Sequence, residues 1–208
     1  MDDREQRAAR FEQRRRLIMT RAAMLLRRGQ QVGFSVDDLC DALHINKSTF
    51  YRYFKSKEHL LYTLHQSAMD DLDQMLDKAL QVEGTARDKL AAAIAGHVLL
   101  QQRTGVSALA IPQTGTFSAR NRRLVIKRRD EYEAKFRMLI QNGIDEGIFR
   151  QCDPAIQSIL LLSLLNSVQT WYKEEGSYSP AELASIIVDS FLSGLVSRQD
   201  GTSSTTES

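Results

Sequence analysis

The feature that most constrains this chain is residues 35–57, SVDDLCDALHINKSTFYRYFKSK, which predict two short helices joined by a tight turn. Ser35 stands before an apolar run at helical spacing, and serine is a residue type that caps helix N-termini. The run breaks at residues 44–46, where Asn46 is placed to cap a second helix over residues 47–54. Two helices this close in sequence are expected to pack against each other.

The second of these helices has two chemically different faces. Phe50 and Phe54, four residues apart, share one face and are expected to pack on the first helix. The opposite face and its flanks present cations, hydroxyls and phenols: Lys47, Ser48, Thr49, Tyr51, Arg52 and Tyr53. This is the design of a helix-turn-helix, whose second helix enters the DNA major groove. The alternative is an ordinary helical hairpin with a polar outer face.

The flanking sequence extends the pattern, with an amphipathic helix that ends at Gly29 and another helix that begins at Lys57. Over about 45 positions the chain resembles the DNA-binding domain of the tetracycline-repressor (TetR) family of bacterial regulators. The resemblance rests on Ala22, Ala23, Leu26, Gly29, Ser35, Val36, Leu39, Leu43, Ser48, Thr49, Phe50, Tyr51, Phe54, Lys57, Glu58 and Leu60.

Three positions depart from the family pattern. His44 stands at the usual turn glycine, which raises the question of backbone strain. Cys40 replaces an alanine in the first short helix, and Asn46 replaces the serine cap of the second. None of the three lies on the predicted DNA face.

The resemblance implies a role for each residue on or beside that face. Contacts to bases and nearby phosphates are expected from Lys47, Ser48, Thr49 and Tyr51, with Arg52 beside them. Contacts to the DNA backbone are expected from Ser35, Tyr53 and Lys57.

Charge is distributed unevenly along the chain. Residues 1–60 hold 13 Lys and Arg against 8 Asp and Glu, for a net +5, whereas residues 61–208 hold 15 against 18, for a net −3. A basic DNA-binding end on a mildly acidic body suits a protein that neutralises phosphates. An arginine run near the N-terminus supplies much of this charge: Arg4, Arg7, Arg10, Arg14, Arg15 and Arg16. It is either a solvated helix face or an extension that contacts DNA backbone or minor groove.

The composition excludes several classes of protein. No run of 18 apolar residues is present, so a membrane span is not expected. The charged N-terminal sequence MDDREQRAAR lacks the apolar core of a signal peptide. Cys40 and Cys152 form neither a disulfide framework nor a metal-binding spacing. We therefore expect a cytoplasmic protein, associated with the nucleoid.

The remaining sequence predicts an all-α fold with an N-terminal helix-turn-helix domain and a larger helical domain for ligand binding and dimerisation. Glycine and proline punctuation predicts helices at 57–81, 85–103, 118–146, 154–172 and 180–198. Asp153 and Ser179 each precede a proline, which is typical of a helix start. The expected domains are residues 1–56 and 57–199, followed by a disordered tail at 200–208.

No catalytic constellation appears in the sequence. There is no glycine-rich phosphate loop, no nucleophile elbow, and no cluster of histidine, cysteine and carboxylate at metal-ligand spacing. Enzymatic activity, a metal site and a cofactor are therefore not expected. A helical enzyme would need titratable residues converging in a pocket.

The last two predicted helices are too apolar for a chain of this size to cover alone. The helix at 154–172 is apolar nearly all round, and the helix at 180–198 has a broad apolar stripe. The same pair from a second copy would complete a two-fold four-helix interface, as TetR-family dimers do. The alternative is a monomer that buries the pair internally.

The TetR resemblance also implies a double-stranded DNA operator and a small hydrophobic effector. Residues expected to line the effector site are His97, Phe117, Tyr132, Phe136, Leu165 and Trp171. The basic run at 120–129 is either an anchor for an anionic ligand or a solvated face. The sequences at 144–149 and 170–176 loosely resemble subgroups that control lipid or acyl-CoA catabolism.

The sequence therefore predicts a dimeric repressor that a lipid-like or acyl-CoA-like ligand releases from its operator. The alternative is a DNA-bound adaptor of the same fold that docks protein partners and has no small-molecule inducer.

Overall fold

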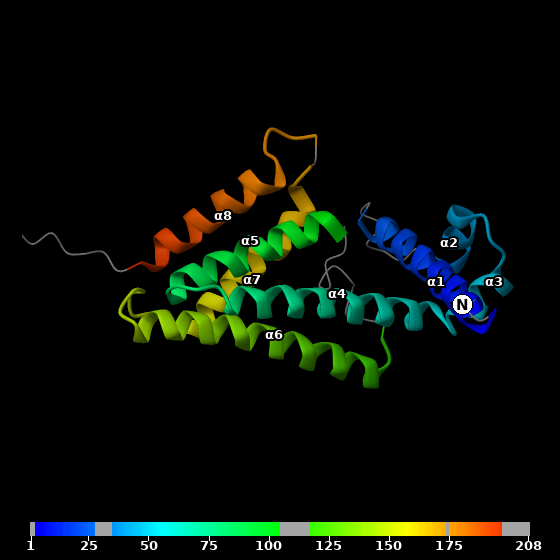
Figure 1. Cartoon of the computed structure of the whole chain (residues 1–208), viewed down its shortest axis with the longest axis horizontal. Coiled ribbons are helices and arrows are strands. Elements are labelled where there is room, and N and C mark those ends of the chain that lie inside the picture. The colour runs from blue at the N-terminus through cyan, green and yellow to red at the C-terminus, as the bar shows by residue number, and fades with distance from the viewer. Residues whose placement is uncertain (1–2, 28–34, 105–116, 174, 197–208) are drawn as a thin grey trace, which may run out of the picture.

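The computed structural model describes residues 3–27, 35–104, 117–173 and 175–196. Within these residues the chain is all-α, as predicted, and forms eight helices (Figure 1). They are α1 (Asp3–Arg27), α2 (Val36–Leu43), α3 (Lys47–Tyr53), α4 (Lys57–Leu80), α5 (Ala86–Thr104), α6 (Ala119–Asp145), α7 (Pro154–Trp171) and α8 (Pro180–Leu195). The predicted helix stop at Gly29 and the tail at 200–208 lie outside the described residues.

Side-chain caps define both short helices. Ser35 accepts a hydrogen bond from the Asp38 backbone N–H, and the Asp38 carboxylate accepts one from the Ser35 backbone N–H in return, which forms a capping box. Asn46 caps α3 by accepting a hydrogen bond from the Thr49 N–H at 2.8 Å. Between them, His44 adopts φ 52° and ψ 46°. The turn thus has the left-handed backbone conformation that glycine usually adopts at a helix end, although the residue here is histidine.

A small core joins the first four helices. Ile18 and Ala22 of α1, Leu39 of α2, and Phe50 and Phe54 of α3 are all fully buried. The two phenylalanine rings stack with their centroids 5.9 Å apart, as their spacing predicts. The same core also includes Leu60 from the first turn of α4, Phe117 just before α6, and Val125 of α6. The DNA-binding domain is therefore packed partly by the far side of the chain.

The helix α4 belongs to both cores. Its first turns contribute Leu60 and Leu64 to the N-terminal core, and later turns contribute Leu72 and Leu76 to the larger one. Figure 1 shows α4 running from beside α1 into the larger domain, with α6 alongside it. One continuous helix therefore connects the two cores.

The larger domain is built around α5, which contacts α4, α6, α7 and α8. Its core side chains are predominantly apolar and come from all five of its helices. At its far end Phe149 packs on Gly143 so closely that a Cβ there would lie 2.1 Å from the ring. Phe149 also forms an isolated antiparallel bridge with Val196 after α8. The predicted helix starts at Asp153 and Ser179 are confirmed as caps of α7 and α8.

Candidate DNA-binding surface and effector domain

The N-terminus of α3 presents Lys47 and Ser48 at the surface. Lys47 Nζ lies 2.9 Å from an Asp37 carboxylate oxygen on α2, and both side chains are more than half exposed. This hydrogen bond raises the pKa of Lys47, so the ammonium stays charged. Because exposed ion pairs contribute little free energy, DNA phosphate or a base edge can compete with Asp37. The Ser48 hydroxyl donates to the Asn46 side chain at 2.8 Å.

The C-terminal half of α3 is held against α1 by aromatic contacts. Tyr51 is 51% exposed and its ring meets Phe50 edge-on. Arg52 lies over the Tyr53 ring at 5.1 Å and donates to its hydroxyl at 3.1 Å. Tyr53 also packs on Phe11 of α1, with the centroids 4.7 Å apart. The half-buried Tyr53 therefore connects α3 to α1.

The starts of α2 and α4 lie close together. Hydrogen bonds from the Ser35 backbone and hydroxyl lower the pKa of Asp38, and the nearby Lys57 charge lowers it further. Ser35 and Lys57, both predicted to hold the DNA backbone, thus both lower the pKa of Asp38. The structure places all eight predicted DNA-binding residues on the N-terminal domain or on the first residue of α4.

Two residues outside the predicted DNA-binding set also shape this surface: His59, not singled out from the sequence, and Arg15, named there only within the arginine run. His59 accepts a hydrogen bond from the Lys55 backbone N–H at 3.2 Å and packs on Phe54, which fixes the turn between α3 and α4. Arg15 lies over the Phe54 ring at 5.5 Å. The signal for Arg15 was its helical spacing from Ile18 and Phe11, which continues the buried face of α1 towards the N-terminus.

The larger domain has a hydrogen-bonded polar group inside its apolar core. His97 Nδ1 lies 2.9 Å from the Tyr132 hydroxyl, and His97 Nε2 lies 2.7 Å from the Gln101 amide nitrogen. None of the three residues is more than 3% exposed. Burial lowers the pKa of His97 to about 4, so the ring is neutral at pH 7. With the amide donating to Nε2, the ring proton lies on Nδ1 and is donated to Tyr132.

A second histidine is also buried. His65 of α4 is fully buried, and neither ring nitrogen has a hydrogen-bond partner among the described residues; the Gln101 carbonyl oxygen also has none. Burial and the charges of Arg129 and Arg128 lower the pKa of His65 to about 4. Arg129 lies one helical turn from Tyr132, so these side chains share a face of α6.

Four of the six predicted ligand residues meet in this core: His97, Tyr132, Phe136 and Leu165. The other two do not join them. Phe117 lies in the N-terminal core, where its ring meets Tyr62 edge-on. Trp171 is 51% exposed on α7 and donates its indole N–H to Ser167. Trp171 is therefore not among the side chains of this core.

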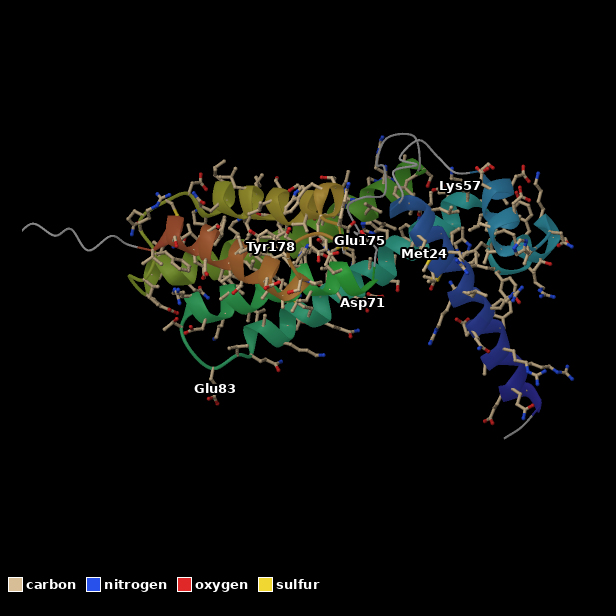
Figure 2. The ribbon with its side chains drawn as sticks, turned by 90° about the horizontal axis from the view of Figure 1, so that it is seen from above. Met24, Lys57, Asp71, Glu83, Glu175 and Tyr178 are labelled. Carbon is tan, nitrogen blue, oxygen red and sulfur yellow. The ribbon has the colours of Figure 1, made fainter. Side chains whose placement is uncertain are left out.

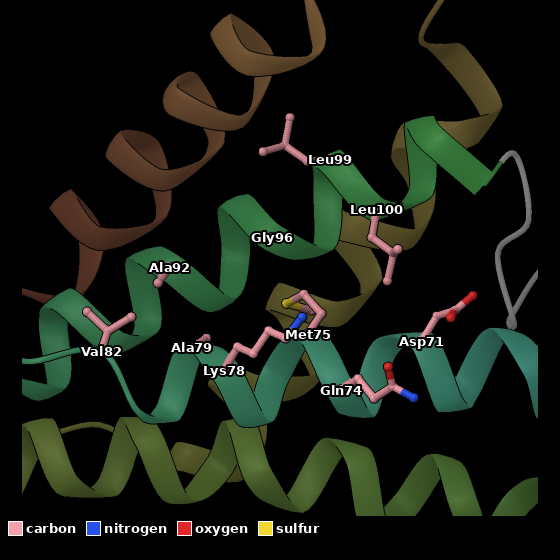
Figure 3. Close-up of a pocket in the computed structure, with 10 residues that line it drawn as sticks. All are labelled: Asp71, Gln74, Met75, Lys78, Ala79, Val82, Ala92, Gly96, Leu99 and Leu100. Atoms are coloured by element: carbon pink, nitrogen blue, oxygen red, sulfur yellow. The ribbon is translucent and has the colours of Figure 1, made fainter.

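A surface groove of about 440 Å³ runs between α4 and α5 (Figure 3). Gly96 lies in its wall, where a Cβ would lie 2.5 Å from the Met75 sulfur and would require that flexible side chain to move. None of the predicted ligand residues lines it. The lining residues are Asp71, Gln74, Met75, Lys78, Ala79, Val82, Ala92, Gly96, Leu99 and Leu100.

The basic run at 120–129 is only partly a free surface. Arg128 pairs with Asp70 at 2.5 Å and with Asp73 at 3.2 Å, both on α4. Further along α6, Lys135 pairs with Asp73 and Asp77 at 3.0 and 2.9 Å. Arg128 therefore ties α6 to α4, which is a structural role rather than that of a ligand anchor.

The helix α7 buries one face and leaves the other uncovered. Leu161, Leu165 and Val168 are fully buried. On the opposite side, Ile159 and Leu160 are each 54% exposed. The uncovered stripe consists of Ile156, Ile159, Leu160, Leu164 and Trp171, and Ile186 of α8 is also exposed. An apolar stripe of this length on one helix is typical of a protein interface.

None of the helices in the described part of the chain has the length and apolar character of a bilayer-spanning segment. The same residues contain no group of three or more histidine, cysteine or carboxylate side chains placed to hold a metal ion.

Comparison with solved structures identifies the same architecture in known regulators. A TetR family transcriptional regulator, PfmR from Thermus thermophilus, is 28% identical, with a TM-score of 0.76 over 85% of this chain and 97% of that one. AibR, solved in complex with isovaleryl coenzyme A and operator DNA, is 21% identical, with a TM-score of 0.75 over the same shares. KstR2 of Mycobacterium tuberculosis, a ketosteroid transcriptional regulator, is 17% identical, with a TM-score of 0.80 over 89% of this chain and 96% of that one.

Sequence comparison gives the family. A curated relative, the fatty acid metabolism regulator protein of Bacillus subtilis (strain 168), is 24% identical over 152 residues, which are 71% of this chain and 77% of that protein. The family model "Bacterial regulatory proteins, tetR family" matches residues 18–63, and "Tetracyclin repressor-like, C-terminal domain" matches residues 83–195. The chain therefore belongs to the TetR family and is a DNA-binding transcriptional regulator.

Proposed function

We propose that the protein is a homodimeric repressor that leaves its operator when a small, mainly apolar ligand binds inside the larger domain. The observation on which this rests is the buried, hydrogen-bonded group of His97, Gln101 and Tyr132 in the apolar core, together with the separately buried His65, whose ring nitrogens have no hydrogen-bond partner among the described residues. Buried polar atoms without hydrogen bonds destabilise a fold by about 1–3 kcal/mol each. An unsatisfied buried polar group in a folded protein therefore calls for an explanation, and a bound partner provides one.

The chemistry of this group fits a ligand with an apolar body and one polar end. A carboxylate or carbonyl would accept hydrogen bonds from neutral imidazole and amide N–H groups, and the partly buried Arg129 favours negative charge there. Burial lowers the pKa of Arg129 only to about 10, so the guanidinium remains charged at pH 7. Two similar proteins support this class, since one is named for fatty acid metabolism and another was solved with isovaleryl coenzyme A.

In this proposal the N-terminal domain, residues 1–56, contacts the operator through α3, and residues 57–199 bind the effector and the second protomer. Lys47, Ser48, Thr49 and Tyr51 contact base edges and nearby phosphates, with Ser35, Arg52, Tyr53 and Lys57 on the backbone. The uncovered stripe of α7, together with α8, forms the two-fold interface. The protein would act in the cytoplasm on nucleoid DNA.

The test begins with an operator duplex selected from a random DNA library by the full-length protein. Fluorescence anisotropy then follows release of this duplex during titration with fatty acids, acyl-CoAs and steroid acids. We expect at least one of them to weaken operator binding by 5–150-fold, the ordinary range of allosteric coupling.

A matched pair of substitutions separates the buried polar group from a general effect. Gln101→Leu should abolish the response to the ligand and leave operator affinity unchanged. Gln141→Leu, on an exposed site of α6, should change neither. If no compound in the panel releases the duplex, the ligand-released repressor is rejected and the protein-docking adaptor becomes the better explanation.

A further inference from the structure

The helix α1 is much longer than the domain that it packs in. Its buried residues, Ile18, Ala22 and Ala23, all belong to its C-terminal half, whereas every residue from 4 to 14 is exposed. Residues 4–14 alone extend about 16 Å at 1.5 Å per residue. Figure 2 shows this N-terminal part running out past the rest of the molecule. It also precedes residue 18, where the family's DNA-binding model begins. We call residues 4–14 the N-terminal arm.

The base of the arm is fixed to the helix that faces DNA. Phe11 packs on Tyr53 with the ring centroids 4.7 Å apart, and Arg15 lies over the Phe54 ring at 5.5 Å. Both partners stand at the C-terminal end of α3. These contacts hold the base of the arm against the end of α3, so the direction of the arm relative to α3 is fixed.

The charges of this segment are sorted around the helix. At about 100° per residue, Arg7, Arg10 and Arg14 lie within an arc of roughly 60°, and Arg4 lies roughly 60° beyond Arg7. Glu5 and Glu12 lie almost opposite, together with Arg16. A helix whose charges served only solubility has no need for this separation, whereas a helix that meets a polyanion does.

We propose that the N-terminal arm is a second DNA-contacting element, whose Arg7, Arg10 and Arg14 edge lies along backbone phosphates flanking the half-site that α3 enters. An α-helix with its side chains is about 10–12 Å wide and the minor groove of B-DNA is about 6 Å wide. The arm therefore lies across the backbone and does not enter that groove. Phosphates have no sequence identity, so the arm adds affinity and length of footprint without adding base preference.

The test compares two arginines that stand two residues apart on opposite edges of the helix. Each phosphate contact contributes about 0.9 to the slope of log affinity against log salt. Arg14→Gln should lower the steepness of that slope by about 0.9 for each arm that binds, and Arg10→Gln should do the same. Arg16→Gln removes the same charge from the other edge and should leave the slope unchanged. Slopes are measured on the full-length protein with a selected operator that has long flanks.

A second, shorter duplex shows where on the DNA the arm binds. It contains only the segment that the Arg10→Gln, Arg14→Gln double variant protects in a footprinting experiment. On this shorter duplex the difference between Arg14→Gln and wild type should disappear. The proposal is overturned if Arg14→Gln and Arg16→Gln behave alike on the long duplex. It is also overturned if Arg14→Gln changes which sequences are selected, because that would indicate base contact. Circular dichroism of each variant checks that helical content is retained.

Discussion

At the scale of single residues, His44 shows how a turn glycine can be replaced. Its backbone adopts φ 52°, the only positive φ at a non-glycine position among the described residues. An L-residue in this region costs about 1–2 kcal/mol. The turn persists because the His44 N–H bonds back to the end of α2 and Ile45 N–H bonds to the Cys40 carbonyl at 2.9 Å.

His44→Gly should therefore stabilise the protein. Relief of the left-handed strain exceeds the extra chain entropy of glycine in the unfolded state, which leaves a gain of about 0.5–1 kcal/mol. Urea denaturation measures this gain as a higher midpoint at unchanged slope. His44→Val, β-branched at the same position, should lower the midpoint, and a rise for both variants would contradict the assignment of strain.

Lys47 and Lys57 are expected to differ in what they recognise. Lys47→Ala should relax sequence preference, at a cost of about 1–3 kcal/mol where the lysine meets a guanine edge. Lys57→Ala, at the start of α4 near the backbone, should weaken all duplexes about equally and lower the salt slope by about one unit. Binding of each variant to operator and to scrambled DNA across a salt series separates the two outcomes, and equal loss of selectivity would disprove the assignment.

His65 makes stability depend on pH. Burial holds its pKa at about 4 in the folded protein, below the ordinary value of 6.5, and the same holds for His97. Between these values the unfolded chain binds more protons than the folded one, so the stability present above pH 6.5 is lost as pH falls towards 4. We expect His65→Leu to lose less stability than wild type between about pH 7 and pH 5, measured by urea denaturation at both. If His65→Leu and wild type lose the same free energy of unfolding between these two pH values, His65 does not contribute to the pH dependence.

At the scale of elements, α7 is the helix whose two faces differ most in what covers them. Its inner face packs on α6 and α5, whereas its outer stripe is apolar and exposed. Burying a leucine or isoleucine side chain contributes about 1.5–3 kcal/mol, so several per protomer suffice for a stable dimer.

Ile159→Glu should accordingly convert the dimer to a monomer, because the charge would have to be buried without a partner. Ile126→Glu is the matched control, since Ile126 of α6 is also exposed, at 42%, but lies outside the α7 stripe. Light scattering with size-exclusion chromatography gives the molecular mass of each. A dimeric Ile159→Glu variant would place the interface elsewhere.

The helices themselves follow closely from sequence, while the relations between them do not. Asn46, Asp153 and Ser179 mark helix starts because a cap depends only on local chemistry. The hydrogen bond between His97 of α5 and Tyr132 of α6 depends on how these two helices are rotated, which no single helix encodes. Trp171 could have been placed correctly, because it continues the exposed spacing of Ile156, Leu160 and Leu164 along α7.

At the scale of the whole molecule, the proposed ligand and the operator would be coupled through α4, which contributes residues to both cores. If the ligand weakens operator binding by a given factor, the operator must weaken ligand binding by the same factor. Isothermal titration of the effector into free protein and into the protein–operator complex should give affinities that differ by the factor found in the release assay. A mismatch between the two factors would show that release does not proceed by simple two-site linkage.

The N-terminal core has a consequence for engineering. Phe117 and Val125 pack among the residues of the DNA-binding domain. Glu58 accepts hydrogen bonds from the Ser118 backbone N–H at 2.7 Å and the Asn121 side chain at 2.8 Å. A chimera that joins residues 1–56 to the sensor half of another regulator would therefore leave its DNA-binding module with a gap in its interior. Transplanting residues 57–64 and 117–125 along with that module would restore the missing wall, so the exchangeable unit of this protein is discontinuous in sequence.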